Sequence, residues 1–178
     1  MQFLASDALS RARRVRLVVF DVDGVLTDGK LWYGPGGEEL KAFHAFDGHG
    51  VRLLLMAGLK TAIISARQSQ AVAERAKELG IEHVMQGVEN KRQAFDSLLR
   101  RLRVKRDATS YMGDDVVDIP VLVRCGFACA PHEAPEAVRR HVHYVASASA
   151  GHGAAREVCE FILETQGKLG RVLKHFLK

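Results

Sequence analysis

Features that would assign the chain to several large protein classes are scarce in this sequence. The three cysteines, Cys125, Cys129 and Cys159, are odd in number, lack the spacing of a metal site and lie in apolar stretches, where a cysteine usually serves as a small buried hydrophobe. No apolar run is long enough to cross a bilayer. Residues 1–16 lack the apolar segment and cleavage pattern of a signal peptide. We therefore expect a cytoplasmic protein with reduced cysteines and no membrane partner.

The composition indicates a globular chain with an excess of positive charge. Apolar residues make up 47% of the 178 residues, enough for one domain over 1–178 to bury its own core. The formal net charge is +5, and aromatic residues amount to 7%. The two basic groups, at 11–16 and 100–106, contain few aromatic side chains that could stack on bases. We interpret them as solvated helix faces and expect no nucleic-acid partner, although the positive field favours a small anionic substrate.

Short apolar runs alternate with amphipathic segments along the chain. The runs that predict strands lie at 16–20, 60–65, 83–86, 109–113 and 127–130, with a last edge strand at 144–145. The segments that predict helices lie at 50–57, 68–79, 91–102, 119–125 and 154–163, followed by a C-terminal tail over about 164–178. This alternation predicts an α/β fold, Rossmann-like, with a central and mostly parallel sheet.

The segment over about 28–47 has a different pattern. Two β-type stretches, KLWY and ELKAFHAF, flank the turn-forming residues GPGGE. This arrangement predicts a β-hairpin that projects from the sheet. No segment is long enough to form a separate cap domain.

Two aspartates follow the first predicted strand. Asp21 and Asp23 lie where open α/β sheets bind their ligands, beyond the carboxyl ends of the strands. One carboxylate can attack phosphorus to give an acyl phosphate, and a second carboxylate two residues on can protonate the leaving oxygen and then activate water. Gly24 allows the backbone to approach a phosphate closely. The pair therefore favours phosphoryl transfer.

Groups that suit a phosphate lie at other strand ends. Asp114 and Asp115 follow the strand TSYM, and carboxylates together with a substrate phosphate are suitable ligands for Mg²⁺. Lys91 can reach the phosphate as a point charge. The hydroxyl of Ser65 and the amides that follow, beginning with Ala66, offer hydrogen-bond donors. Each residue alone also fits a turn, a cap or a surface position, but their order along the strand ends favours one phosphate site.

This order of motifs, DxDGxxTD, a strand-terminal Ser, a Lys and GDDxxD over 21–118, resembles the haloacid dehalogenase superfamily of phosphohydrolases. The resemblance implies that Asp21 is the nucleophile and a metal ligand, that Asp23 is the general acid and base, and that Asp114 is a further ligand of Mg²⁺. Asp23 would bind the metal through its carbonyl. The residues that would support this site are Thr27, Asp115 and Asp118.

Further segments are similar to the 3-deoxy-D-manno-octulosonate 8-phosphate phosphatases over nearly the whole chain. They include DVDGVLTDG, AFHAFDGHGVRLL, KTAIISAR, QGVENK, YMGDDVVDIPVL and GHGAAREVCEFILETQGKL. The resemblance implies release of the free sugar acid for lipopolysaccharide synthesis. It also implies a fold without a cap and a homotetramer in which neighbouring subunits complete each active site. Arg67 and Arg75 would hold the sugar-acid carboxylate, Arg75 from a neighbouring subunit, because arginine suits bidentate carboxylate recognition.

Two motifs depart from the family pattern. Ser65-Ala66-Arg67 stands where the usual motif is Thr-Gly-Arg, and His152 stands where many members carry Arg. Whether the C-terminal tail closes a neighbouring active site is therefore left open. His44 and His49 flank an Asp-Gly pair, but no metal-binding motif accompanies them, so we interpret this stretch as structural.

Three alternative functions differ in testable ways. Phosphatases of related nine-carbon sugar acids are similar, but their residue at the position of Arg67 tends to be acidic. A non-catalytic assembly module would be indicated by loss of the aspartate pair or of Lys91, all of which are present. Nucleic-acid binding through the basic groups would be sensitive to salt and would survive the substitution Asp21→Asn.

Overall fold

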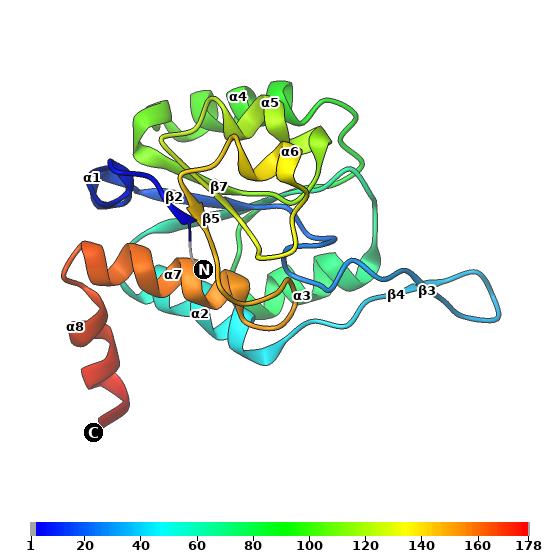
Figure 1. Ribbon diagram of the computed structural model, residues 1–178. Coiled ribbons are helices and arrows are strands. Elements are labelled where there is room, and N and C mark those ends of the chain that lie inside the picture. Colours follow the sequence, from blue (N-terminus) through cyan, green and yellow to red (C-terminus); the bar gives the residue numbers. More distant parts are fainter. Residues whose placement is uncertain (1–2, 178) are drawn as a thin grey trace.

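A seven-stranded sheet forms the centre of the computed structural model, which describes residues 3–177 (Figure 1). The strand order is β1-β9-β8-β7-β2-β5-β6, and all neighbours are parallel except β1, which runs antiparallel to β9. The strands are β1 (Phe3–Leu4), β2 (Leu17–Phe20), β5 (Lys60–Ile64), β6 (His83–Met85), β7 (Thr109–Met112), β8 (Phe127–Ala130) and β9 (Tyr144–Val145). The prediction of an α/β fold with a mostly parallel sheet is confirmed.

One edge of the sheet differs from the prediction. The sequence pattern predicts an edge strand at 144–145, but β1 pairs with β9 on its outer side, with Leu4 opposite Tyr144. The edge prediction is therefore wrong. A strand of two residues carries no alternation that a sequence pattern could detect.

Helices cover both faces of the sheet (Figure 1). They are α1 (Ala8–Arg14), α2 (Ala45–Met56), α3 (Gln70–Leu79), α4 (Lys91–Leu102), α5 (Ile119–Leu122), α6 (Glu136–Arg139), α7 (Ala154–Thr165) and α8 (Leu169–Leu173). Val18 and Phe20 of β2 pack with residues of α1, α2, α3 and α7, whereas Leu17 and Val19 pack with residues of α4, α5 and α6. Successive side chains of a strand point to opposite faces, so β2 contributes to two hydrophobic cores.

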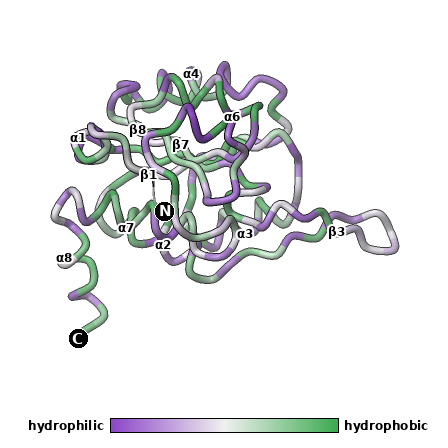
Figure 2. Tube along the Cα trace, in the orientation of Figure 1, coloured by the Kyte–Doolittle hydropathy of each residue, from purple (hydrophilic) through white to green (hydrophobic). Residues whose placement is uncertain are grey.

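The surface pattern of the helices follows from this layering. In Figure 2, hydrophobic and hydrophilic residues alternate along α4, as expected of a helix with one face on a sheet. Within residues 3–177, no helix is both long and apolar enough to cross a membrane. After α7, the chain continues through α8 into a short 3-10 helix, Lys174–Leu177.

The hairpin projects from the body of the molecule, but it is shorter than predicted. Its strands are β3 (Trp32–Tyr33) and β4 (Glu39–Leu40). Helix α2 begins at Ala45 instead of about 50, because the side chain of His44 accepts a hydrogen bond from the N–H of Phe46 at 3.2 Å and caps the helix. The predicted hairpin boundary near 47 is therefore wrong.

Asp47, in the first turn of α2, caps a second helix far along the chain. Its side chain is buried, and it accepts hydrogen bonds from the backbone N–H groups of Gly153, at 3.1 Å, and Arg156, at 2.9 Å. These groups belong to the N-terminus of α7, where backbone donors have no partner inside the helix. The carboxylate also interacts favourably with the helix dipole. Asp47 therefore joins α2 to α7.

We expect Asp47→Ala to lower the free energy of unfolding by about 2–3 kcal/mol, because buried backbone donors lose a charged acceptor. Urea unfolding followed by circular dichroism would measure the change. Asp96→Ala is a suitable control, because Asp96 forms an exposed ion pair with Arg106 and should cost less than about 1 kcal/mol. Equal losses in the two variants would contradict the capping role.

Candidate active site

The carboxyl ends of β2, β5 and β7 meet at one edge of the sheet. Because these three strands are parallel neighbours, the residues that follow them surround a common cleft of about 270 Å³. The cleft is lined by Asp21, Asp23, Gly29, Leu31, Ser65, Ala66, Arg67, Lys91, Asp114, Asp115 and Val117. Most of the site residues predicted from sequence thus lie around one space.

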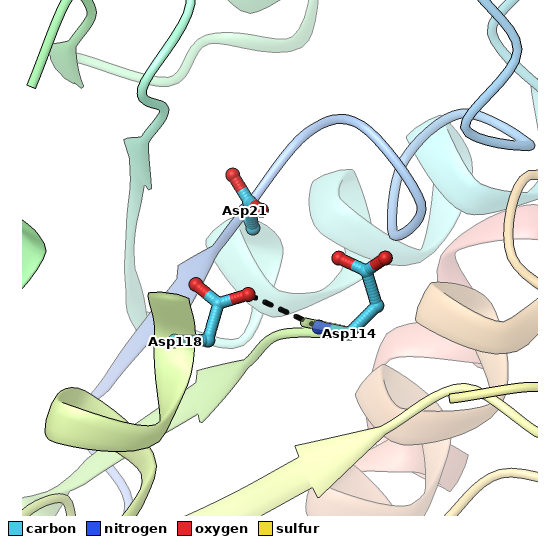
Figure 3. A group of neighbouring side chains, drawn as sticks. All are labelled: Asp21, Asp114 and Asp118. Atoms are coloured by element: carbon cyan, nitrogen blue, oxygen red, sulfur yellow. Dashed lines mark hydrogen bonds between the residues drawn. The ribbon is translucent and has the colours of Figure 1, made fainter. Parts of the chain in front are cut away.

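Three aspartates form a compact acidic cluster at this cleft: Asp21 and Asp114 line it, and Asp118 is fully buried (Figure 3). Asp21, Asp114 and Asp118 each place a carboxylate oxygen within 4.8 Å of the others. Burial first, and then the charge of Asp118, raise the pKa of Asp21 to about 6. Burial first, and then the charges of Asp21 and Asp118, raise the pKa of Asp114 to about 7. The cluster therefore favours a compensating cation.

Asp118 is fully engaged in hydrogen bonds. Its Oδ1 accepts from the hydroxyl of Tyr111 at 2.6 Å and from Lys91 at 2.7 Å. Its Oδ2 accepts from the backbone N–H groups of Asp114, at 3.2 Å, and Asp115, at 3.3 Å. Figure 3 shows the bond to the Asp114 nitrogen as a dashed line. Asp118 therefore orients the loop that carries Asp114.

The remaining oxygens of the cluster suit a hard metal ion. Oδ1 of Asp114 is buried and has no hydrogen-bond partner within the described part of the chain. A buried polar atom without a partner is costly, and a cation ligated there would remove that cost. Carboxylate oxygens beside a phosphate are typical ligands of Mg²⁺. The residues present therefore fit this ion.

Lys91 lies between two of the carboxylates at the first turn of α4. Its ammonium nitrogen is 2.7 Å from Oδ2 of Asp21 and 2.7 Å from Oδ1 of Asp118, and its side chain is 4% exposed. Burial alone would lower the pKa of Lys91, but the charges of the two aspartates outweigh burial and raise it. Lys91 therefore remains a fixed positive charge at the floor of the cleft.

The loop after β2 is shaped by Gly24 and Thr27. Gly24 has a φ of +79°, and a Cβ at this position would lie 2.1 Å from Oδ2 of Asp114, so both the backbone and the acidic cluster require glycine here. The buried hydroxyl of Thr27 donates to the carbonyl of Val22 at 3.4 Å and accepts from the N–H of Gly29 at 3.2 Å. These bonds close the turn that carries Asp23.

The segment after β5 supplies hydroxyl and guanidinium groups. Ser65 is buried at the end of the strand, and its Oγ accepts a hydrogen bond from the N–H of Arg67 at 3.3 Å. Ala66 lines the cleft, and the side chain of Arg67 is 45% exposed at its rim. A carboxylate in the cleft could therefore reach Arg67.

Arg75 does not reach the cleft of its own chain. It lies on α3, where its Nη1 is 3.0 Å from Oε2 of Glu78 and its guanidinium carbon is 6.0 Å from the ring centre of Phe43. Gly48 of α2 packs against the same guanidinium. Within one chain, Arg75 thus faces the base of the hairpin.

The structure brings three further residues to the site that the sequence motifs did not identify. Lys41 contacts Oδ1 of Asp23, and its ammonium is 2.7 Å from Oε1 of Glu39. Tyr111 bonds to Asp118 from beneath. The sequence pattern predicts a buried strand around Tyr111 and a hairpin around Glu39 and Lys41, and no motif marked these three residues as part of the site.

A larger cavity than the cleft lies at the opposite end of the sheet. It has a volume of about 1080 Å³ and brings both basic groups together around the amino ends of β2, β5 and β7. The basic residues that line it are Arg13, Arg14, Arg16, Lys60, Arg103, Lys105 and Lys168. Its lining contains one carboxylate, that of Asp107. It therefore lacks the paired carboxylates that the cleft provides.

Comparisons with known proteins show which family the chain is similar to. Residues 81–158 match the family model of haloacid dehalogenase-like hydrolases. The chain is 41% identical over 166 residues to the 3-deoxy-D-manno-octulosonate 8-phosphate phosphatase of Escherichia coli strain K12, which is 93% of this chain and 88% of that protein.

Two solved structures of such phosphatases are also similar. One, from Moraxella catarrhalis in complex with magnesium ion, phosphate ion and a KDO molecule, has a TM-score of 0.93 at 36% identity and covers 96% of this chain and 98% of that chain. The other, from Yersinia pestis, has a TM-score of 0.91 at 41% identity and covers 93% of this chain and 89% of that chain.

Proposed function

Because the chain belongs to the 3-deoxy-D-manno-octulosonate 8-phosphate phosphatases of the haloacid dehalogenase-like hydrolases, we propose that it hydrolyses 3-deoxy-D-manno-octulosonate 8-phosphate to the free sugar acid and phosphate. In this proposal the reaction passes through an aspartyl-phosphate on Asp21. The chain is a phosphoric monoester hydrolase. The observation that carries the mechanistic proposal is the position of Asp21, at the end of β2 and beside both Lys91 and the carboxylate of Asp114. Oδ1 of Asp114 has no hydrogen-bond partner within residues 3–177.

The proposed reaction has two steps. An oxygen of Asp21 attacks phosphorus, the bond from phosphorus to the sugar oxygen breaks, and Asp23 gives a proton to that oxygen. Asp23 then takes a proton from water, and the water oxygen attacks phosphorus and displaces the carboxylate of Asp21. Lys91 offsets negative charge beside the nucleophile, and Ser65 and the amide of Ala66, which line the cleft, would donate to phosphate oxygens.

The proposed metal is Mg²⁺, the ion named in the Moraxella catarrhalis complex. In our proposal the carboxylates of Asp21 and Asp114 and the backbone carbonyl of Asp23 hold the ion. When bound, it neutralises charge on the phosphate. The carboxylate of Asp118 is occupied by hydrogen bonds, so its proposed role is to support the residues that bind the metal. Asp115 caps the neighbouring 3-10 helix, Val116–Asp118.

The proposed substrate specificity depends on Arg67 and on assembly. Arg67 lies at the rim of the cleft, and a guanidinium suits the bidentate recognition of a sugar-acid carboxylate. Arg75 would act from a neighbouring subunit of a homotetramer. Trp32, Tyr33 and Leu40 on the hairpin are 57%, 61% and 55% exposed, which supports contact between hairpins of different subunits.

We further propose that the reaction supplies lipopolysaccharide precursor synthesis in the cytoplasm. All three cysteines are free and buried, which is compatible with a reducing compartment. Burial raises the pKa of Cys125 to about 12, so this thiol is unreactive at neutral pH.

Phosphate release from a panel of sugar phosphates tests the proposed substrate. We expect the native chain to prefer the octulosonate 8-phosphate over simple hexose phosphates by at least about 100-fold in kcat/KM. Arg67→Ala should remove most of this preference, because the carboxylate loses its partner, while Arg92→Ala, an exposed change on α4, should not. Activity spread evenly over the panel in the native chain would contradict the substrate. Preference for a nine-carbon sugar acid phosphate would favour the alternative.

The affinity for Mg²⁺ should depend on pH, because protons compete for its ligands. The pKa of Asp21 is raised to about 6 and that of Asp114 to about 7, in each case first by burial and then by neighbouring carboxylates. Both groups are deprotonated at pH 8 and mostly protonated below pH 6. We expect the dissociation constant to rise about 20-fold from pH 8 to pH 6. Titration calorimetry would measure it, and a constant value over this interval would contradict competition at these carboxylates.

A further inference from the structure

Lys41, at the end of the hairpin, has a deeply buried charged side chain that contacts Asp23, a residue of the cleft. It follows β4, and its side chain is 1% exposed. An ammonium in such a place is costly unless it is paired. Its partners are Oδ1 of Asp23, which it contacts directly, and Oε1 of Glu39 at 2.7 Å. The buried ammonium of Lys41 therefore pairs directly with Asp23, the residue that we propose as general acid and base.

Four charged groups form a closed ring around this contact. Glu39 lies between two cations, with its Oε1 near Lys41 and its Oε2 at 3.3 Å from Nη1 of Arg67. Arg67 in turn has its Nε at 3.9 Å from Oδ2 of Asp23. Signs alternate around the ring, so each carboxylate faces two cations. Oδ1 of Asp23 is thus held from the hairpin, and Oδ2 faces the segment after β5.

Asp23 has little else to hold it in place. Its side chain is 20% exposed, and within residues 3–177 its hydrogen-bond partner is Lys41. Asp118, by contrast, accepts from two side chains and two backbone N–H groups. Without Lys41, the carboxylate of Asp23 would keep only the distant guanidinium of Arg67 and could rotate away from a leaving oxygen.

We infer that Lys41 is a positioning residue, which holds Oδ1 of Asp23 so that Oδ2 can carry the proton given to the leaving oxygen, and which is itself held by Glu39. This inference rests on the proposed function and deepens it, because it makes the hairpin part of the catalytic apparatus. Direct binding of the sugar-acid carboxylate by Lys41 is disfavoured, since the ammonium is buried against two carboxylates. Arg67 also pairs with Glu39, but its side chain is 45% exposed and remains accessible to such a carboxylate.

The test uses the dependence of the rate on the leaving group. A sugar alkoxide needs a proton from Asp23 to leave, whereas 4-nitrophenolate leaves without one. The value of kcat/KM covers the steps up to formation of the aspartyl-phosphate, where this proton is transferred. We expect Lys41→Met to lower kcat/KM by about 100-fold with the octulosonate 8-phosphate and by less than about 3-fold with 4-nitrophenyl phosphate.

Three further variants make the result specific. Lys41→Arg keeps a cationic donor and should remain within about 10-fold of the native chain with the sugar phosphate. Glu39→Gln, which removes one partner of Lys41, should give the same leaving-group pattern with a loss of about 10-fold. It also provides the test if Lys41→Met does not fold. Lys30→Met is the matched control, because Lys30 is exposed beside the hairpin and pairs with Asp28, and it should leave both rates unchanged.

Inhibition by the product sugar acid separates positioning from binding. If Lys41 positions Asp23, the inhibition constant should change by less than about 3-fold in Lys41→Met. An inhibition constant that rises in parallel with the loss of kcat/KM would overturn the inference, as would equal losses with both substrates. A native chain that hydrolyses neither phosphate would refute the proposed function itself, whereas an active native chain with an unaffected Lys41→Met would refute this inference alone.

Discussion

Replacement of Asp21 by asparagine is expected to lower phosphate release by at least about 10⁴-fold in kcat, because an amide cannot form the acyl phosphate. The substitution preserves the shape of the side chain at the end of β2, where Lys91 lies 2.7 Å from Oδ2 of Asp21. The loss should therefore reflect chemistry and not collapse of the cleft. Rapid acid quench with radiolabelled substrate should trap phosphoprotein in the native chain and none in the variant.

Asp28→Asn is the control for Asp21→Asn. Asp28 follows the same loop, but it pairs with Lys30 at the surface, so we expect activity within about 2-fold of native. Residual activity of Asp21→Asn above about 1% of native would contradict the covalent mechanism. Such a result would favour direct attack of water on the substrate.

Replacement of Lys91 by methionine is expected to have the second-largest effect, a fall of about 10³-fold in kcat/KM. The buried ammonium separates the carboxylates of Asp21 and Asp118. Without it, the nucleophile faces another carboxylate with no compensating charge, and the phosphate loses a cationic neighbour. Steady-state kinetics in saturating Mg²⁺ would measure the loss.

The same substitution should lower stability in the absence of metal. Removing one member of a buried charge cluster leaves the others uncompensated, which costs about 3 kcal/mol. Mg²⁺ should restore part of this loss, because it binds the folded chain. Arg92→Met, the next residue on α4 and an exposed one, is the control for both measurements. A Lys91→Met variant with kcat/KM within about 10-fold of native would contradict an electrostatic role.

The convergence of the strand ends was predictable from sequence. A buried apolar run ending in Asp21, another ending in Ser65 and a third before Asp114 imply parallel strands, and parallel strands place their carboxyl ends at one edge of the sheet. The register of β2 with β5 and β7 confirms this arrangement. Local hydrophobic patterns were sufficient here because each residue lies next to its own strand.

The contribution of the hairpin was not predictable in this way. Glu39 and Lys41 lie in the second β-type stretch of the hairpin, where no motif marks them, and only the path of the hairpin brings Lys41 to Asp23. Tyr111 fits a core strand by pattern, and its bond to Asp118 depends on the fold of the following loop. Contacts made across the chain leave no local periodicity to detect.

The early start of α2 was missed for a different reason. Gly48 and Gly50 reduce the helical propensity of this segment, yet both are buried in the helix. A Cβ on Gly50 would lie 2.9 Å from Cα of Arg156 on α7. The two helices can approach closely because the glycine has no side chain, so the residue that weakens the sequence pattern is the one that the packing requires.

The contact between Gly24 and Asp114 has a consequence for how such a sequence can change over generations. A side chain at position 24 would occupy the space of the Asp114 carboxylate, and shortening residue 114 to make room would delete the proposed metal ligand. No compensating substitution at position 114 can therefore preserve both the loop and the ligand. Although positions 24 and 114 are ninety residues apart in the sequence, a substitution at either one is expected to abolish the proposed metal site.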